Sequence, residues 1–123
     1  MLMFHMKMNK KYLYSIYYKM VKIFKPTKVV ITKSDRDKKM KAVFYNKDKK
    51  IKTTHFGAKG MSDYTIHKDD KRKERYLARH NPKNTKENWN DPMTAGALSR
   101  YILWNKKTLK DSINDYKRRF KLS

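Results

Sequence analysis

The first clear pattern along the chain is helical and runs over residues 9–24. Its polar positions recur three or four residues apart and form one stripe: Lys11, Ser15, Lys19 and Lys22. Most of the remaining positions are apolar or aromatic, and Pro26 marks the end of the segment. We therefore predict an amphipathic helix, which makes residues 1–26 a basic aromatic N-terminal segment.

The apolar part of this segment is too short, and too often interrupted by lysine, for a transmembrane helix. It also lacks the clean apolar region and small-residue cleavage site of a secretory signal, so we expect a protein that is not secreted. Three roles stay open for the helix. It packs on the domain as core, docks a partner protein, or lies on an anionic membrane surface.

The pattern then changes to the two-residue alternation of β-structure. We predict strands over residues 28–33, 40–46 and 51–56, joined by polar turns at 34–39 and 46–50. Short polar turns of this kind connect antiparallel neighbours, so we expect a three-stranded meander.

Alternation also assigns residues to the two faces of the predicted sheet. In the third strand Ile51, Thr53 and His55 share one face. We expect one face of the sheet to be buried and the other to carry Lys41 and Lys52 outward. A three-stranded sheet needs helices to cover its apolar face.

Three helices are predicted after the sheet. The first begins near Asp69 or Asp70, which are suited to capping, and ends before Pro82. The second begins at Asp91, whose carboxylate precedes a proline at the first helical position. The third opens with Thr108, in a capping-box pattern with an aspartate three residues later.

The third helix carries the cleanest apolar stripe in the chain: Leu109, Ile113, Tyr116 and Phe120. Together these patterns predict an α+β fold, a three-stranded antiparallel meander packed against three helices, with an amphipathic N-terminal helix. We expect two parts, residues 1–26 and a single α+β domain over residues 27–123.

Charge adds the main functional signal. The chain has 123 residues, 33 Lys or Arg, 11 Asp or Glu, and a net charge of +22. Successive quarters ending at residues 30, 60, 90 and 123 carry +7, +7, +3 and +5, so the whole folded surface is basic. Of the cations 26 are Lys and seven are Arg, which favours sequence-independent neutralisation of phosphates over base reading. Cysteine is absent, which excludes disulfides, thiolate metal sites and a cysteine nucleophile.

Two basic helical faces are the candidate nucleic-acid-binding surfaces. They belong to the first and third predicted helices, and a glycine-bracketed turn adds one further lysine. The predicted phosphate contacts are Lys59, Lys71, Arg72, Arg75, Arg79, Lys110, Lys117, Arg118 and Lys121.

Other chemistry has weak sequence support. Histidine spacing matches no zinc signature, so we expect no metal and no cofactor. A metal-dependent nuclease would require His55 and His80 to converge with a carboxylate, and this is the enzymatic alternative. Gly57 to Gly60 lacks the Gly-Lys-Ser/Thr ending of a nucleotide-binding P-loop.

Three long motifs add a resemblance: HFGAKGMSDYTIHKD, ENWNDPMTAGALSRYILWNK and TLKDSINDYKRRF. They resemble a family of small basic proteins without assigned function, encoded by nucleocytoplasmic large DNA viruses, the giant viruses related to mimiviruses and chloroviruses. The resemblance covers roughly residues 40–122 and supplies no catalytic residues. It implies a viral product, in the virion or in the viral factory of the infected-cell cytoplasm.

The resulting expectation is a non-enzymatic viral structural protein that binds nucleic acid, most simply DNA, for genome neutralisation or packaging. The alternative is a minor capsid or scaffold protein whose N-terminal helix contacts acidic capsid partners or the anionic inner membrane. The position of that helix discriminates between them, because an exposed apolar face favours docking. The sequence leaves the oligomeric state open.

Overall fold

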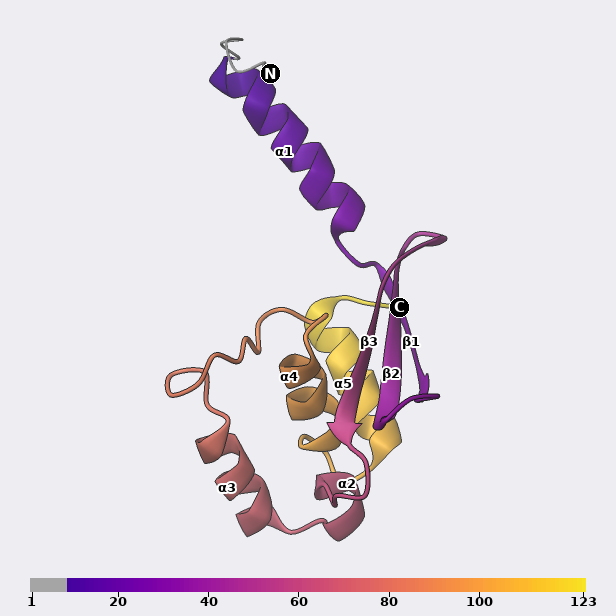
Figure 1. Ribbon diagram of the computed structural model, residues 1–123, viewed down its shortest axis with the longest axis vertical. Helices are drawn as coiled ribbons and strands as arrows, with labels where there is room; N and C mark the ends of the chain where they lie inside the picture. The colour runs from indigo at the N-terminus through magenta and orange to yellow at the C-terminus, as the bar shows by residue number, and fades with distance from the viewer. Residues whose placement is uncertain (1–8) are drawn as a thin grey trace.

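A three-stranded antiparallel sheet organises the fold in the computed structural model, which describes residues 9–123 (Figure 1). The strands are β1 (Lys28–Lys33), β2 (Lys38–Asn46) and β3 (Lys49–Ala58), in the order β1-β2-β3. The predicted meander is therefore confirmed, with β2 and β3 slightly longer than the alternation indicated. The protein has the predicted α+β fold.

The register of the sheet corrects the predicted face of β3. Thr54 pairs with the buried Ala42, and Phe56, which is 1% exposed, lies on the same inner face. Thr53 and His55 therefore point to the outer face, contrary to the expectation that they are buried. The cause is a bulge at Ile51, which has no partner in the register and so shifts the alternation by one residue.

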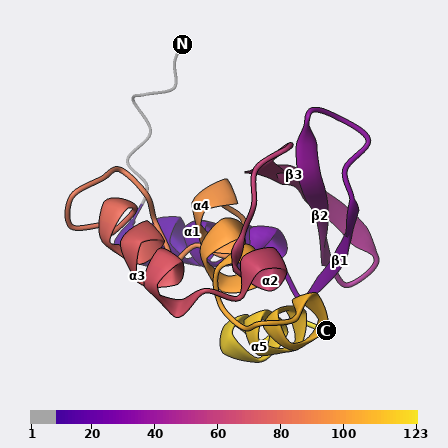
Figure 2. The same cartoon turned by 90° about the horizontal axis from the view of Figure 1, so that it is seen from below.

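Five helical segments follow the sheet. They are α2 (Tyr64–His67), α3 (Asp70–Arg79), α4 (Ala95–Leu98), the π-helical turn η2 (Ser99–Leu103) and α5 (Leu109–Phe120). Both views place them on one side of the sheet (Figures 1 and 2). Among residues 9–123, no helix covers the opposite face of the sheet.

The core lies between the sheet, the α4–η2 segment and α5. Its members come from all three strands and from these helical segments: Val29, Ala42, Phe44, Phe56, Leu98, Ile102, Leu103, Tyr116 and Leu122. Leu103 lies so close to Gly57 that a Cβ there would be 2.8 Å from its Cδ1. Gly57 also has φ +85°, so both its backbone conformation and the lack of space for a Cβ require glycine here.

Side-chain caps explain where the helices begin. Asp69 Oδ1 accepts the backbone N–H groups of Lys71 and Arg72, and Thr108 caps α5, both as predicted. The predicted start of the second helix at Asp91 is wrong. Asp91 accepts an N–H within a turn instead, and Thr94 caps α4.

The N-terminal helix α1 (Lys10–Phe24) projects away from the domain (Figure 1). Asn9 caps it, as its side chain accepts from the N–H of Tyr12 at 2.9 Å. Every described side chain from Lys10 to Met20, and Phe24, is exposed. The hypothesis that this helix packs on the domain as core is therefore wrong. Residues 1–8 of the predicted segment lie outside the described residues.

Three lysines adopt the left-handed backbone region that glycine and asparagine usually occupy. Lys47 lies in the β2–β3 turn with φ 56°, while Lys68 and Lys121 are the C-caps of α2 and α5, both with φ 55°. A left-handed residue at these positions lets the chain turn away from a strand or a helix end.

Candidate nucleic-acid interface

Helix α3 carries the strongest of the predicted basic faces. Lys71, Arg72, Arg75 and Arg79 are all exposed, as the sequence predicted. The backbone N–H of Arg72, and then that of Lys71, hold the pKa of the Asp69 carboxyl below its usual range. The helix is therefore well capped and presents four cations along one side.

The inner side of α3 is anchored by aromatic stacking. Tyr76 is buried, and its ring stacks on Trp104 and on His80 with centroids 4.2 Å away in each case. Burial, and then the nearby Glu87 carboxylate, raise the pKa of Tyr76 to about 12. Lys73 on the same side donates to the Asn105 carbonyl at 2.7 Å. These contacts anchor the helix whose outer side carries the four cations.

Helix α5 presents the second predicted face. Lys110, Arg118 and Lys121 are exposed and Lys117 is half-buried. Arg118 lies 3.4 Å from the Asp115 carboxylate, so part of its charge is compensated within the helix.

Lys59, the ninth predicted contact, is exposed in the turn after β3. The nine residues do not form a single surface. In both views α3 and α5 lie on different sides of the helical layer, separated by α2 and the α4–η2 segment (Figures 1 and 2). The structure thus brings together four cations on α3 and four on α5, as two separate basic surfaces.

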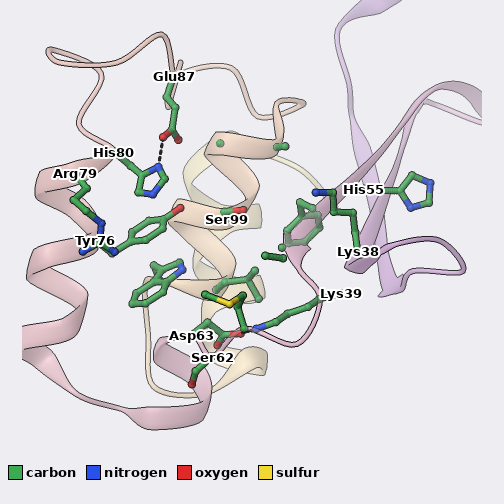
Figure 3. Close-up of a pocket in the computed structure, with 18 residues that line it drawn as sticks. Lys38, Lys39, His55, Ser62, Asp63, Tyr76, Arg79, His80, Glu87 and Ser99 are labelled. Atoms are coloured by element: carbon green, nitrogen blue, oxygen red, sulfur yellow. Dashed lines mark hydrogen bonds and ion pairs between the residues drawn. The ribbon is translucent and has the colours of Figure 1, made fainter.

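A pocket of about 470 Å³ lies between α3, the α4–η2 segment and the end of the sheet (Figure 3). Glu87 pairs with His80 Nδ1 and also accepts from the indole N–H of Trp89 at 3.3 Å. On the opposite wall Lys39 forms an ion pair with the buried Asp63 at 2.6 Å. Arg79 alone among the predicted contacts lines the pocket.

The Glu87 contacts in this pocket join the loop after α3 to the helices around it. Glu87 comes from the polar loop after α3, and a Cβ on Gly96 would lie 2.7 Å from its Oε1. The loop is therefore pinned against α4 by one carboxylate with two partners. No local sequence signal indicates that Glu87 approaches Gly96 so closely.

The histidines do not form the constellation that the nuclease alternative requires. His55 points away from this pocket and lies 2.8 Å from the Ser34 hydroxyl, whereas His80 faces into it beside Glu87 (Figure 3). Within residues 9–123, no group of three or more His, Asp or Glu could hold a metal ion. The geometry gives the nuclease hypothesis no support.

The outer face of the sheet contains functional candidates that sequence reasoning missed. Lys41 and His55 are cross-strand partners there, and Lys50 pairs with Tyr45. Alternation alone identified Lys41, but the pairing of Lys50 and the outward direction of His55 depend on the bulge at Ile51. No local signal revealed that shift.

Comparison with known proteins gives one match. Residues 29–80 match a family of unknown function (DUF5754), a stretch that begins in β1 and ends at the C-cap of α3. The match therefore includes the sheet from Val29 onward and the α3 cations, and leaves out α1, α4 and α5. No curated protein and no solved structure matches the chain.

Proposed function

We propose that this chain is a non-enzymatic structural protein whose folded domain binds nucleic acid through phosphate contacts. The observation that supports this most directly is the anchored row of exposed cations on α3. Because the helix itself is anchored, its backbone needs no ordering when the cations meet phosphates. Each phosphate that they neutralise releases condensed counterions, which drives association.

The lysine excess bears on specificity. Lysine acts as a mobile point charge, whereas the planar arginine fork is the usual reader of guanine. With 26 Lys against seven Arg, the proposed binding has little sequence preference. The viral setting rests on the resemblance alone. In it, the chain is a virion component that neutralises or packages a DNA genome, in the virion or the viral factory.

Salt titration tests the nucleic-acid proposal. Affinity for a labelled duplex should fall steeply between about 50 and 200 mM salt and differ little between sequences. The variant K71Q/R72Q/R75Q removes three charges from α3, and K10Q/K11Q/K19Q removes three from α1 as a matched control. The α3 variant should lower the salt slope by about 0.9 per lost contact, and more than the control does. Affinity that stays flat with salt would contradict the proposal.

The projecting helix α1 supports a second candidate function. Its exposed apolar face, formed by Leu13, Ile16, Tyr17, Met20 and Phe24, repeats at helical spacing. Exposed patches of this kind mark interaction sites. Lys10, Lys11 and Lys19 accompany the face, and α1 has no acidic residue. We infer that α1 docks the protein on an anionic bilayer surface.

Charge and ring chemistry favour a lipid surface over a second copy. Two copies of a chain with net charge +22 repel each other, whereas anionic headgroups attract every lysine of α1. Tyrosine suits the headgroup boundary because its ring is apolar and its hydroxyl is polar. The described helices include none that is long and apolar enough to cross a bilayer, so α1 would lie in the interface plane.

Vesicle flotation tests this second candidate. The full chain should float with vesicles containing phosphatidylglycerol and not with pure phosphatidylcholine, and helicity should rise on binding. L13S/M20S should abolish flotation, while the domain variant K71Q/R72Q/R75Q should keep most of it. If L13S/M20S instead removes self-association of the chain without vesicles, the partner is a second copy and the lipid assignment is wrong. Co-purification with a capsid shell through α1 would indicate the scaffold alternative.

A further inference from the structure

The outer face of the sheet has an ordered chemical layout. Three cross-strand rows run across β1, β2 and β3, and the register defines them: Lys28, Tyr45 and Lys50; Val30, Val43 and Thr53; Thr32, Lys41 and His55. A basic row with an aromatic ring thus lies on one side of a β-branched row, and a second basic row lies on the other side. The two basic rows are four residues apart along β2, or about 13 Å.

This face is open to solvent. All of the helical segments after the sheet lie on its other side (Figures 1 and 2). Val30, in the middle row, is 39% exposed although it is a β-branched apolar residue on a strand. Val30 is thus an apolar side chain left in water between two rows that carry cations, with the half-buried Val43 beside it. This layout would suit a ligand with both apolar and anionic parts.

A hollow of about 350 Å³ lies on this face. Its cations come from three segments of the chain: Arg36 from the β1–β2 turn, Lys41 from β2 and Lys50 from β3. Asp35, which lies 3.7 Å from Lys41, is the single carboxylate in its lining. With neutral histidine the lining therefore carries a net charge of +2, and the meander brings together these charges from three successive segments.

Two side chains of the hollow lining add hydrogen-bonding groups for an anion. The Ser34 hydroxyl accepts the backbone N–H of Arg36 at 3.0 Å and lies 2.8 Å from His55 Nδ1. When Ser34 donates its hydrogen to Nδ1, the neutral imidazole carries its proton on Nε2 and is a donor there. The Thr53 hydroxyl, also in the hollow lining, supplies a second uncharged donor.

We propose that the outer face of the sheet binds single-stranded nucleic acid, with a backbone phosphate in the hollow formed by Arg36, Lys41 and Lys50. Tyr45 provides a ring on which a base stacks. The valines of the middle row favour a single-stranded ligand over a duplex. Val30 and Val43 gain by contact with apolar base faces, which a single strand exposes and a duplex keeps stacked inside. The proposal rests on nucleic-acid binding by this chain and names its form.

The Tyr45 ring already makes a cation–π contact, since Lys28 Nζ lies 5.2 Å from the ring centroid. A stacked base would replace or share this contact, while the Lys28 charge remains beside the strand to meet a phosphate. Successive parts of one strand would therefore meet a cation, an apolar row and a second set of cations as they cross the sheet.

Binding to two labelled probes, a mixed-sequence oligonucleotide and its duplex, tests the proposal. The sheet variant R36Q/K41Q/K50Q is matched in charge by the helix variant K71Q/R72Q/R75Q. The sheet variant should lose at least roughly ten-fold of its single-strand affinity and lower that salt slope by about 2, as expected for three lost phosphate contacts. For the duplex probe, the loss of affinity in the sheet variant should be no larger than the loss in the helix variant.

Tyr45→Leu, which keeps an apolar side chain, should weaken single-strand binding by roughly ten-fold and leave duplex binding unchanged. Amide shifts in 15N spectra on adding the oligonucleotide should include Thr53 and His55. A wild-type chain that binds neither probe would refute nucleic-acid binding altogether. A sheet variant that binds the single strand like wild type, while the helix variant does not, would refute only this assignment.

Discussion

Helices α1 and α5 have the same sequence pattern and opposite environments. Both are amphipathic, both begin at a side-chain cap, and both carry a stripe of aliphatic and aromatic residues against a basic face. In α5 the stripe from Ile113 to Phe120 packs on the core, where Tyr116 is 0% exposed, and only Leu109 at the start of the helix is exposed. In α1 the stripe meets solvent, and Tyr17 is 65% exposed. The sequence pattern therefore predicts a helix with one apolar face, but it does not predict what that face contacts.

The difference assigns the two helices different roles. The apolar face of α5 contributes to the stability of the domain, because its burial is part of folding. The apolar face of α1 is available to a partner, so its burial would contribute to binding. Substitutions in the two stripes should therefore separate stability from association.

The largest expected effect comes from truncating the two matched tyrosines. Tyr116→Ala should lower the free energy of unfolding by about 3–5 kcal/mol, because it empties a fully buried site. Tyr17→Ala should change it by less than about 0.5 kcal/mol, because that ring is exposed. Urea unfolding followed by tryptophan fluorescence measures both, since Trp89 and Trp104 lie in the domain. Equal losses in the two variants would mean that α1 packs on the domain in solution.

Removing the N-caps should give a smaller contrast. Thr108→Ala should cost about 1 kcal/mol of domain stability, since the N–H of Asp111 loses its partner. Asn9→Ala should leave the urea midpoint unchanged and lower only the far-UV helical signal of α1. A midpoint that shifts in the Asn9 variant would show that the stability of α1 is coupled to that of the domain.

The smallest expected contrast between α1 and α5 is in their response to low pH. The Asn105 amide, which donates to Asp115 at 2.7 Å, and then Arg119, hold the pKa of the α5 residue Asp115 below its ordinary value of 3.8. The stabilisation is fully present above pH 3.8 and is lost as the pH falls through the lowered folded-state value. Domain stability should therefore decline below pH 3.8, and Asp115→Asn should flatten part of that decline. Because α1 has no acidic residue, its helical signal should not follow the same curve.

The fold was predictable wherever the deciding interactions are local. Thr108 and Asp69 cap their helices through N–H groups two or three residues away, and the three strands follow from alternation between polar turns. The start of α4 was mispredicted because Asp91 and Thr94 are both good caps. Only the packing of Ala97 and Leu98 against the sheet decides between them.

The candidate sites were less predictable because they depend on pairing across the fold. The cations of α3 share one helix, so their spacing revealed them. Arg36, Lys41 and Lys50 come from three segments, and only the register and the bulge at Ile51 bring them to one hollow. The contact between Glu87 and His80 likewise depends on how a long polar loop returns to α3.

The three left-handed lysines combine a positive charge with a strained backbone. Left-handed backbone costs a side-chain-bearing residue about 1–2 kcal/mol relative to glycine, and Lys47, Lys68 and Lys121 all accept that cost. Glycine or asparagine would adopt the same backbone at lower cost. Replacing any one of these lysines with glycine would relax the local backbone and remove one positive charge, so turn stability and surface potential oppose each other at all three positions.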